Sequence, residues 1–413
     1  MIWHKFSRSE LLSTFFPTWL WQGRMWAKGK VPSYDIHYWG SAHSHPVLST
    51  YYPIQIISSI IGSRLHINGS FIFYSWSLIS HMVWCVLGWY LFLSQSLSLQ
   101  IALFGAITFT FQAAHLRQQP CIIYTLSWFP WMLYGLTTHN ILLSSVSIGM
   151  ICLSGYYPLA VYLLPVSLIF CQWVPIGIGL LIGLPQIIPF LKHLSSTIRG
   201  TVSAPSNSPT EKKFYFGLTP IILLLLNFKL IYLALLIPCL CLFNKSTLFR
   251  VPQRALILSC YGAIYLSLLT MTKLTNNQVI ALILVQSLDL WIHNKEVMPA
   301  RPFVELWQKP SRAFNNKLTQ YLDKHLGEGK VSGLPYPLFT GHINRFKTIG
   351  YCGSMQTKEM YAWRQSFKHD PFMDGVDVND LTKNGIKYAY SRKKLDWIRT
   401  SVRNLYLNPA YSG

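Results

Sequence analysis

Acidic side chains are scarce in this chain. The 413 residues include 14 Asp and Glu against 35 Lys and Arg, and residues 1–292 contain only four carboxylates: Glu10, Asp35, Glu211 and Asp289. We interpret Glu211 as a loop residue and Asp289 as a marker of a helix end. Acid–base catalysis therefore has few candidate groups. Glu10 and Asp35 lie in one aromatic, His-rich stretch ahead of the main apolar segments, which suggests a site at a membrane surface.

Other signatures are also missing. The first 30 residues contain charges and no continuous apolar core, so they do not have the pattern of a secretory signal. The eight cysteines show neither metal-binding nor disulfide spacing, and we interpret them as small packing residues. The sequence has no repeat, low-complexity tract or glycine-rich phosphate loop. It therefore offers no zinc module, disulfide scaffold or nucleotide-binding loop.

The composition instead favours a membrane protein. Hydrophobic residues make up 51% of the chain and charged residues 12%, about half the 25% share that is usual in soluble domains. Residues 1–292 hold 16 Lys and Arg and 4 Asp and Glu, whereas residues 293–413 hold 19 and 10. This difference indicates a membrane region followed by a soluble tail. Both parts are basic. This surplus positive charge either attracts anionic lipids, lipid carriers and polyanionic polymers, or it reflects a general lysine bias. We expect no nucleic-acid partner.

Nine apolar runs approach the ~20 residues that a helix needs to cross a bilayer. They cover residues 70–93, 97–117, 121–138, 140–154, 157–173, 175–192, 214–243, 253–271 and 277–293. The run at 214–243 is long enough for one bent helix or a hairpin, so we predict eight to ten crossings. Residues 51–61 are too few to span a membrane and predict an interfacial or re-entrant helix.

The predicted fold is an all-α polytopic membrane protein with about eight to ten transmembrane helices and a small α+β soluble C-terminal tail. We assign residues 1–69 to a first loop with interfacial helices, residues 70–293 to the transmembrane domain and residues 294–413 to the tail. The tail combines amphipathic helix patterns with Gly- and Pro-rich turns and an Asn384-Gly385 turn signal.

Four residues of one short segment could ligate a metal. Asp35, His37, His43 and His45 lie within eleven residues, and imidazole and carboxylate both suit transition-metal ions. The spacing is not specific to a metal site. Histidines near a membrane interface also cap backbone groups or pack against aromatic rings, and this structural interpretation stays open.

The two carboxylates of the same region are candidates for a general base. A carboxylate that aromatic walls partly remove from water can accept a proton from an acceptor hydroxyl if its pKa rises towards neutrality. Nearby basic residues could hold the phosphate of a lipid-linked donor. The alternative is that Glu10 and Asp35 form ion pairs with Arg8 and Arg24.

The order of several short motifs resembles a known family. The motifs are SELLSTFFP; GKVP followed by YWGSAHSHPVLSTYYP; an apolar helix ending near His115; LSWFPWMLYGL; Gly155 to Pro158; GLPQIIPFLKHLSSTIR; FYFGLTPIILLLL; and Asp289-Leu290 with Asn294. In this order they resemble the YfhO-like family of bacterial multi-pass membrane proteins, which belongs with the glycosyltransferases of the C-type membrane fold. The resemblance covers nearly all of the membrane region.

The resemblance implies a transferase in the bacterial cytoplasmic membrane. Such an enzyme moves a sugar from a polyprenyl-phosphate donor to an acceptor outside that membrane, here an anionic cell-envelope polymer. It also implies that the first loop and the tail are extracytoplasmic and that Glu10 is the catalytic base. Asp35 would orient groups or bind a metal, Arg199 of SSTIR would contact the donor phosphate, and His37 and Arg117 would bind substrate. No cofactor is certain, although a divalent metal is compatible with this chemistry.

The chain departs from the family pattern at both ends. The family has a transmembrane helix before the acidic residue, whereas nine residues precede Glu10 here, and the tail ends at NPAYSG without a final helix. A truncated, inactive relative is therefore one alternative. A non-enzymatic lipid-carrier transporter or envelope scaffold is another, and a metal-dependent hydrolase built on His37, His43 and His45 is a third.

Overall fold

The structure is a computed structural model. It describes residues 15–32, 49–111, 120–155, 157–196, 218–226 and 256–295, with Lys324 and the strand residues 330–332, 347–349, 386–390 and 397–399. Most of these residues are helical, in agreement with the helical class that the apolar runs predict.

Eleven helices lie in the described segments. They are α1 (Phe16–Trp26), α2 (Pro53–Gly62), α3 (Ile67–Leu93), α4 (Leu99–Phe111), α6 (Pro120–Thr137), α7 (Ile141–Leu153), α8 (Tyr157–Leu168), α9 (Trp173–Ser196), α10 (Leu218–Leu226), α12 (Leu256–Met271) and α13 (Asn276–Lys295). Each helix from α3 onward overlaps one of the predicted apolar runs. Helix α2 coincides with residues 51–61, the short apolar run for which the sequence predicts an interfacial or re-entrant helix.

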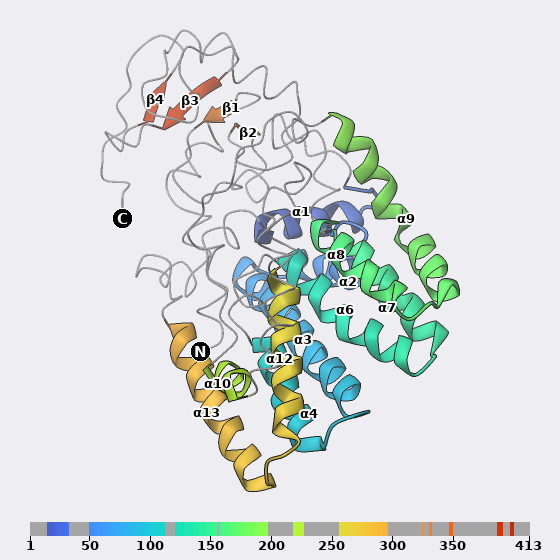
Figure 1. Cartoon of the computed structure of the whole chain (residues 1–413). Coiled ribbons are helices and arrows are strands. Elements are labelled where there is room, and N and C mark those ends of the chain that lie inside the picture. Colours follow the sequence, from blue (N-terminus) through green and yellow to red (C-terminus); the bar gives the residue numbers. More distant parts are fainter. Residues whose placement is uncertain are drawn as a thin grey trace.

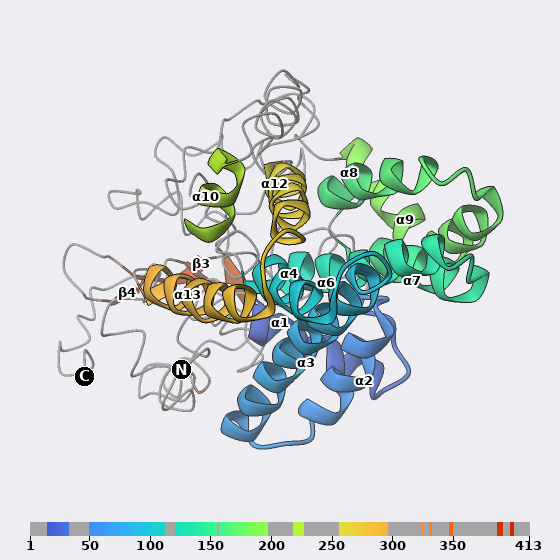
Figure 2. The ribbon, with the colours of Figure 1, turned by 60° about the horizontal axis from the view of Figure 1, so that its bottom comes forward.

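Helices α3, α4 and α6 form the centre of this part of the molecule. Helix α3 packs on α4 and α6, α6 packs on α7, and α7 packs on α9, while α12 and α13 contact α4. In Figures 1 and 2, α10 and α13 lie on the opposite side of the centre from α9. Helix α1 packs on α2 and also contacts α3. The aromatic stretch that contains Glu10 and Asp35 is therefore attached, through α1, to the central helices.

Two described helices, Ile67–Leu93 and Trp173–Lys192 within α9, are long and apolar enough to cross a membrane. Only 39% and 28% of their most apolar windows are buried. Large apolar side chains such as Val83 and Leu181 are 63% and 65% exposed. A core helix of a soluble domain buries its apolar face, so this exposure is typical of a helix surface that faces lipid.

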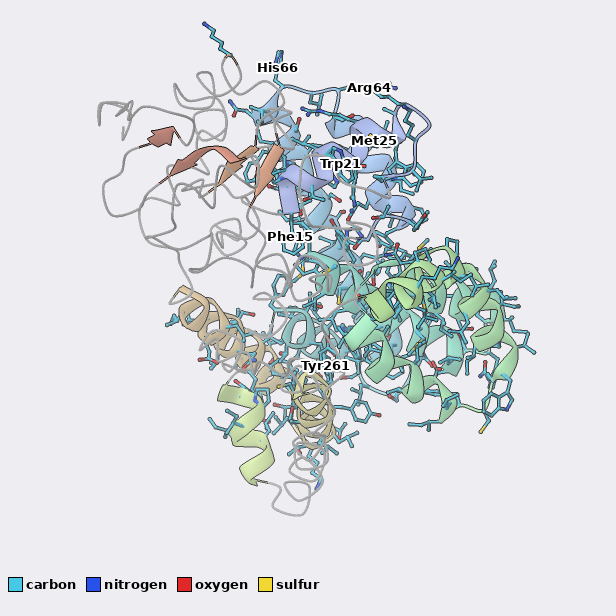
Figure 3. All side chains as sticks on the ribbon, turned by 90° about the horizontal axis from the view of Figure 1, so that it is seen from above. Phe15, Trp21, Met25, Arg64, His66 and Tyr261 are labelled. Atoms are coloured by element: carbon cyan, nitrogen blue, oxygen red, sulfur yellow. The ribbon has the colours of Figure 1, made fainter. Side chains whose placement is uncertain are left out.

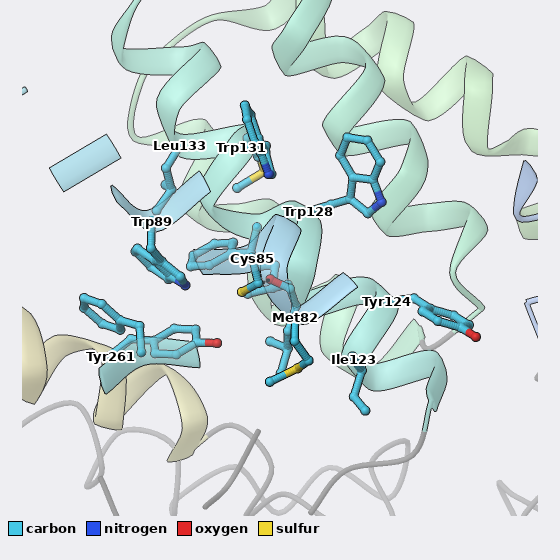
Figure 4. Packing of buried hydrophobic residues seen from close by; sticks show 14 of the residues in the cluster. Met82, Cys85, Trp89, Ile123, Tyr124, Trp128, Trp131, Leu133 and Tyr261 are labelled. Atoms are coloured by element: carbon cyan, nitrogen blue, oxygen red, sulfur yellow. Dashed lines mark hydrogen bonds between the residues drawn. The ribbon is translucent and has the colours of Figure 1, made fainter. Parts of the chain in front are cut away.

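Aromatic rings fill the interface between α3, α4, α6 and α12 (Figure 4). Trp89 stacks on Phe109 with ring centroids 4.1 Å apart, and Tyr261 meets Trp89 edge-on at 5.2 Å. On the other side of α3, Trp84 and Trp131 stack at 4.0 Å, and the Trp131 Nε1–H donates to the Trp84 carbonyl oxygen at 3.0 Å. These rings bury large apolar areas and fix how α3 and α6 cross.

Glycines allow α7 and α9 to pack closely. A Cβ at Gly179 would lie 2.5 Å from the Ile148 side chain and 2.9 Å from the Ser145 carbonyl oxygen. A Cβ at Gly149 would lie 2.5 Å from Ile182. Small residues at such crossings let two backbones approach each other, as is common among membrane helices.

The described part of the tail contains four short strands: β1 (Lys330–Ser332), β2 (Lys347–Ile349), β3 (Ile386–Tyr390) and β4 (Trp397–Arg399). They form one sheet in the order β2-β1-β3-β4. Strand β1 runs parallel to β2 and β3, and β4 runs antiparallel to β3. The α+β tail beyond this sheet stays a prediction.

Candidate functional site

None of the residues that the sequence singles out for the site lies in the described part of the chain. These residues are Glu10, Asp35, His37, His43, His45, Arg117 and Arg199. Among the described residues, Asp289 is the only carboxylate, and no group of three or more His, Cys, Asp or Glu side chains could hold a metal ion. The base, phosphate and metal assignments therefore stay predictions.

A small cavity lies where α1, the segment before α2, α2, α3 and the start of α6 meet. Its volume is about 10 Å³, which is room for about one water molecule and far below the roughly 300–1,000 Å³ of most small-molecule sites. Its walls combine apolar and aromatic side chains with amide and hydroxyl groups: Phe15, Thr18, Trp19, Gln22, Ser49, Gln55, Tyr74, Pro120 and Cys121. Figure 3 labels Phe15 at the start of α1 and Trp21 and Met25 further along it.

A chain of buried amides connects the cavity walls. The Gln55 amide nitrogen donates to the Gln22 amide oxygen at 2.7 Å, and the Gln22 nitrogen donates to the Thr50 hydroxyl oxygen at 2.9 Å. Because an unpaired amide is costly to bury, these hydrogen bonds fix the relative positions of α1, Thr50 and α2. The Trp19 Nε1–H adds a bond to the Ser58 hydroxyl at 3.3 Å.

Two glycines allow α1 and α2 to pack closely. A Cβ at Gly23 would collide with the Ser59 carbonyl oxygen, and a Cβ at Gly62 would collide with the Trp19 ring. A larger residue at either position would separate the two helices. The cavity depends on this contact, because Gln22 and Gln55 bond to each other from the facing sides of α1 and α2.

In the segment before α2, Tyr52 is held by a directional chain of hydrogen bonds. His81 Nδ1 lies 2.6 Å from the Ser77 carbonyl oxygen, which can only accept, so Nδ1 carries a proton. In the neutral ring Nε2 is then an acceptor for the Tyr52 hydroxyl at 2.7 Å. The Tyr52 oxygen in turn accepts from the Trp128 Nε1–H at 2.7 Å. Every group is satisfied when His81 is neutral.

This cluster carries no formal charge. Burial raises the pKa of the Tyr52 hydroxyl far above its ordinary value, so the hydroxyl stays protonated and donates. The Tyr124 ring packs against Tyr52 at 5.1 Å and against His81 at 4.5 Å between centroids. We interpret the cluster as an anchor for the segment that ends the His-rich stretch rather than as a proton carrier.

The same segment is fixed from the opposite side by the turn between α7 and α8 and by α9. The Ser49 hydroxyl donates to the Ser154 carbonyl oxygen, and the Tyr51 backbone N–H donates to the Gln186 side-chain oxygen at 3.2 Å. Gly155 has φ +80°, and a Cβ there would lie 2.7 Å from the Ser49 nitrogen. The turn therefore requires glycine both for its backbone conformation and for its contact with Ser49.

Three segments that carry predicted site residues join the described chain at the cavity. Glu10 precedes the lining residue Phe15 by five residues, His45 precedes Ser49 by four, and Arg117 precedes Pro120 by three. The structure thus brings together the points at which these segments begin or end, although it does not describe the three side chains themselves.

Sequence reasoning did not identify the residues that build this cavity. Gln22 and Gln55 of its walls were not singled out, nor were Thr50 and Gln186, which bond to neighbouring residues, although each is a polar residue in an apolar setting. Such polar residues within apolar helices usually have a structural or functional role, and this signal could have found them.

Comparison of the chain with family models, with curated proteins and with solved structures gives no match. In its described segments the chain is mostly helical, and two of these helices are long and apolar enough to span a membrane.

Proposed function

We propose that this protein is a multi-pass membrane glycosyltransferase of the YfhO-like type in the bacterial cytoplasmic membrane. It transfers a sugar from a polyprenyl-phosphate donor to an anionic cell-envelope acceptor. In this proposal the apolar runs form eight to ten crossings, and residues 1–69 and the α+β tail face outward. Its support is the motif order, the predominance of helices, and the exposed apolar surfaces of α3 and α9.

The main support for the proposal is that three segments with predicted site residues meet at the cavity. Segments holding Glu10, the His-rich stretch and Arg117 all adjoin residues that line it. Helix α9 contributes Gln186 to the same region and ends at Ser196, three residues before Arg199. The cavity itself has room for about one water molecule, so in this proposal the donor and the acceptor bind beside it, where these segments meet, rather than inside it.

The proposed reaction inverts the sugar carbon. Glu10 removes the proton from an acceptor hydroxyl, the acceptor oxygen forms a bond to the anomeric carbon, and the bond from that carbon to the donor phosphate breaks. Negative charge then grows on the departing polyprenyl phosphate. Arg199 and Arg117 would stabilise this charge more strongly in the transition state than in the ground state. Asp35 orients the acceptor, and His37 contacts the sugar.

The first test replaces the proposed base without changing its size. We expect Glu10→Gln to lower transfer of labelled sugar from a polyprenyl-phosphate donor to envelope polymer by ~100-fold or more, because general-base catalysis typically contributes 10²–10⁴-fold. Asp35→Asn should lower it less. Glu211→Gln is the matched control, since its carboxylate lies in a predicted loop, and it should keep full activity.

Full activity of both Glu10→Gln and Asp35→Asn would rule out this assignment. Retained binding of the donor without turnover in the unaltered protein would instead favour a lipid-carrier transporter or scaffold. The described helices favour the enzyme over a proton-coupled transporter in one respect. The buried His81 is fully bonded to Tyr52 and Ser77, so it is not poised to carry a proton.

A further inference from the structure

Helix α2 has its polar and apolar faces reversed relative to those of a soluble protein. Its buried residues are Gln55, Ser58, Ser59 and Gly62. Its isoleucines at positions 54, 57 and 61 are exposed, Ile57 by 61%. A surface helix in water turns its apolar stripe inward. The outer face of α2 therefore requires an apolar environment.

Exposed cationic side chains follow both α1 and α2. Lys28 and Lys30 follow α1, and Arg64 follows α2; all three are exposed. Figure 3 shows Arg64 beside His66 at the turn from α2 to α3. Residues 15–32 and 49–66, which form this layer, contain no Asp or Glu. The layer is thus purely basic around an apolar strip.

We propose that α2 lies flat in the head-group region of an anionic bilayer. Ile54, Ile57 and Ile61 enter the acyl boundary, and Lys28, Lys30 and Arg64 contact lipid phosphates. An apolar strip with flanking cations is the pattern of interfacial helices that bind anionic membranes. Because Gln55 on the inner face lines the cavity, α2 forms the wall between that cavity and the lipid. This inference depends on a membrane location and not on the glycosyltransferase reaction.

Site-specific photocrosslinking of the full chain tests the proposal. Ile57 is replaced by p-benzoylphenylalanine, and the protein is reconstituted in vesicles containing equal amounts of phosphatidylcholine and phosphatidylglycerol. After irradiation, mass spectrometry of the peptide should find phospholipid adducts, with phosphatidylglycerol several-fold enriched. The same probe in place of Lys324, an exposed residue of the predicted soluble tail, should give few lipid adducts.

The charge contribution is tested in the same assay. The variant Lys28→Gln/Lys30→Gln/Arg64→Gln should still form lipid adducts at position 57, but its preference for phosphatidylglycerol should fall towards the bulk ratio. Each surface cation changes affinity for an anionic membrane by about fivefold, from its contribution of about 1 kcal/mol. Lys273→Gln, at an exposed cation between α12 and α13, is the matched control and should leave the preference unchanged.

Two results would overturn the proposal. One is the absence of lipid adducts at position 57, or their replacement by crosslinks between two copies of the chain, which would assign the face to a protein contact. The other is a lipid preference that the triple variant does not alter, which would remove the role of Lys28, Lys30 and Arg64. Both outcomes can be read without any sugar transfer, so they are distinct from failure of the proposed enzyme activity.

Discussion

The Tyr52 hydroxyl shows how one buried polar atom constrains this fold. It accepts from Trp128 and donates to His81. We expect Tyr52→Phe to lower the free energy of unfolding by at least about 2 kcal/mol, because it leaves two buried groups without a partner and each costs roughly 1–3 kcal/mol. Thermal and denaturant unfolding of the purified protein in detergent would measure the change.

A comparison with a less buried tyrosine separates this network from a general effect of the substitution. Tyr265 in α12 is 36% exposed, so Tyr265→Phe should change stability by less than about 0.5 kcal/mol. The double variant Tyr52→Phe/His81→Leu should cost less than the sum of its single changes, because it removes both partners of one bond. Strict additivity would contradict the hydrogen-bond chain from Trp128 to His81.

At the scale of elements, the crossing of α7 and α9 depends on particular glycines. We expect Gly179→Ala to destabilise the protein by about 1–3 kcal/mol, because the new methyl group would overlap Ile148 and overpacking costs about that much. Gly177 lies two residues away on the same helix, and nothing lies within 4 Å of a Cβ placed there. Gly177→Ala should therefore be neutral or slightly stabilising, since alanine is the better helix former.

If Gly179→Ala and Gly177→Ala destabilise the protein equally, the loss of stability does not come from close packing of α7 against α9. The same unfolding measurements serve for both variants. Because Ile182 of α9 also packs against Gly149 of α7, relaxation at the Gly179 position is limited. The predicted difference between the two variants therefore tests the approach of α7 to α9 directly.

The sequence predicts the positions of the described helices but not the cavity between them. Apolar runs fall where α3 to α13 lie because a helix buried in protein or lipid requires such runs. The cavity was not predictable in this way, since Gln22 and Gln55 are 33 positions apart and meet only through the contact of α1 with α2. The length of the apolar run at residues 51–61 also does not show that α2 buries its polar face and exposes its isoleucines. This arrangement becomes visible only when burial is known.

For the whole molecule, the decisive question is whether its exposed apolar surface faces lipid or water. Leu181 lies near the middle of the candidate span in α9 and is 65% exposed. In a soluble protein, Leu181→Arg at such a surface position would change stability by less than about 0.5 kcal/mol. At the centre of a membrane helix the same arginine costs about 2.5–3.5 kcal/mol.

We therefore expect Leu181→Arg to reduce sharply the fraction of the full chain that resists alkaline extraction from membranes. Trp173→Arg is the matched control because Trp173 is equally exposed but begins α9. An arginine there can extend towards the head groups, so its cost should be much smaller. If both variants remain membrane-bound and as stable as the unaltered protein, α9 does not face lipid. In that case the exposed apolar surface of α9 would need a protein partner, and the membrane enzyme would lose one of its two candidate spans as support.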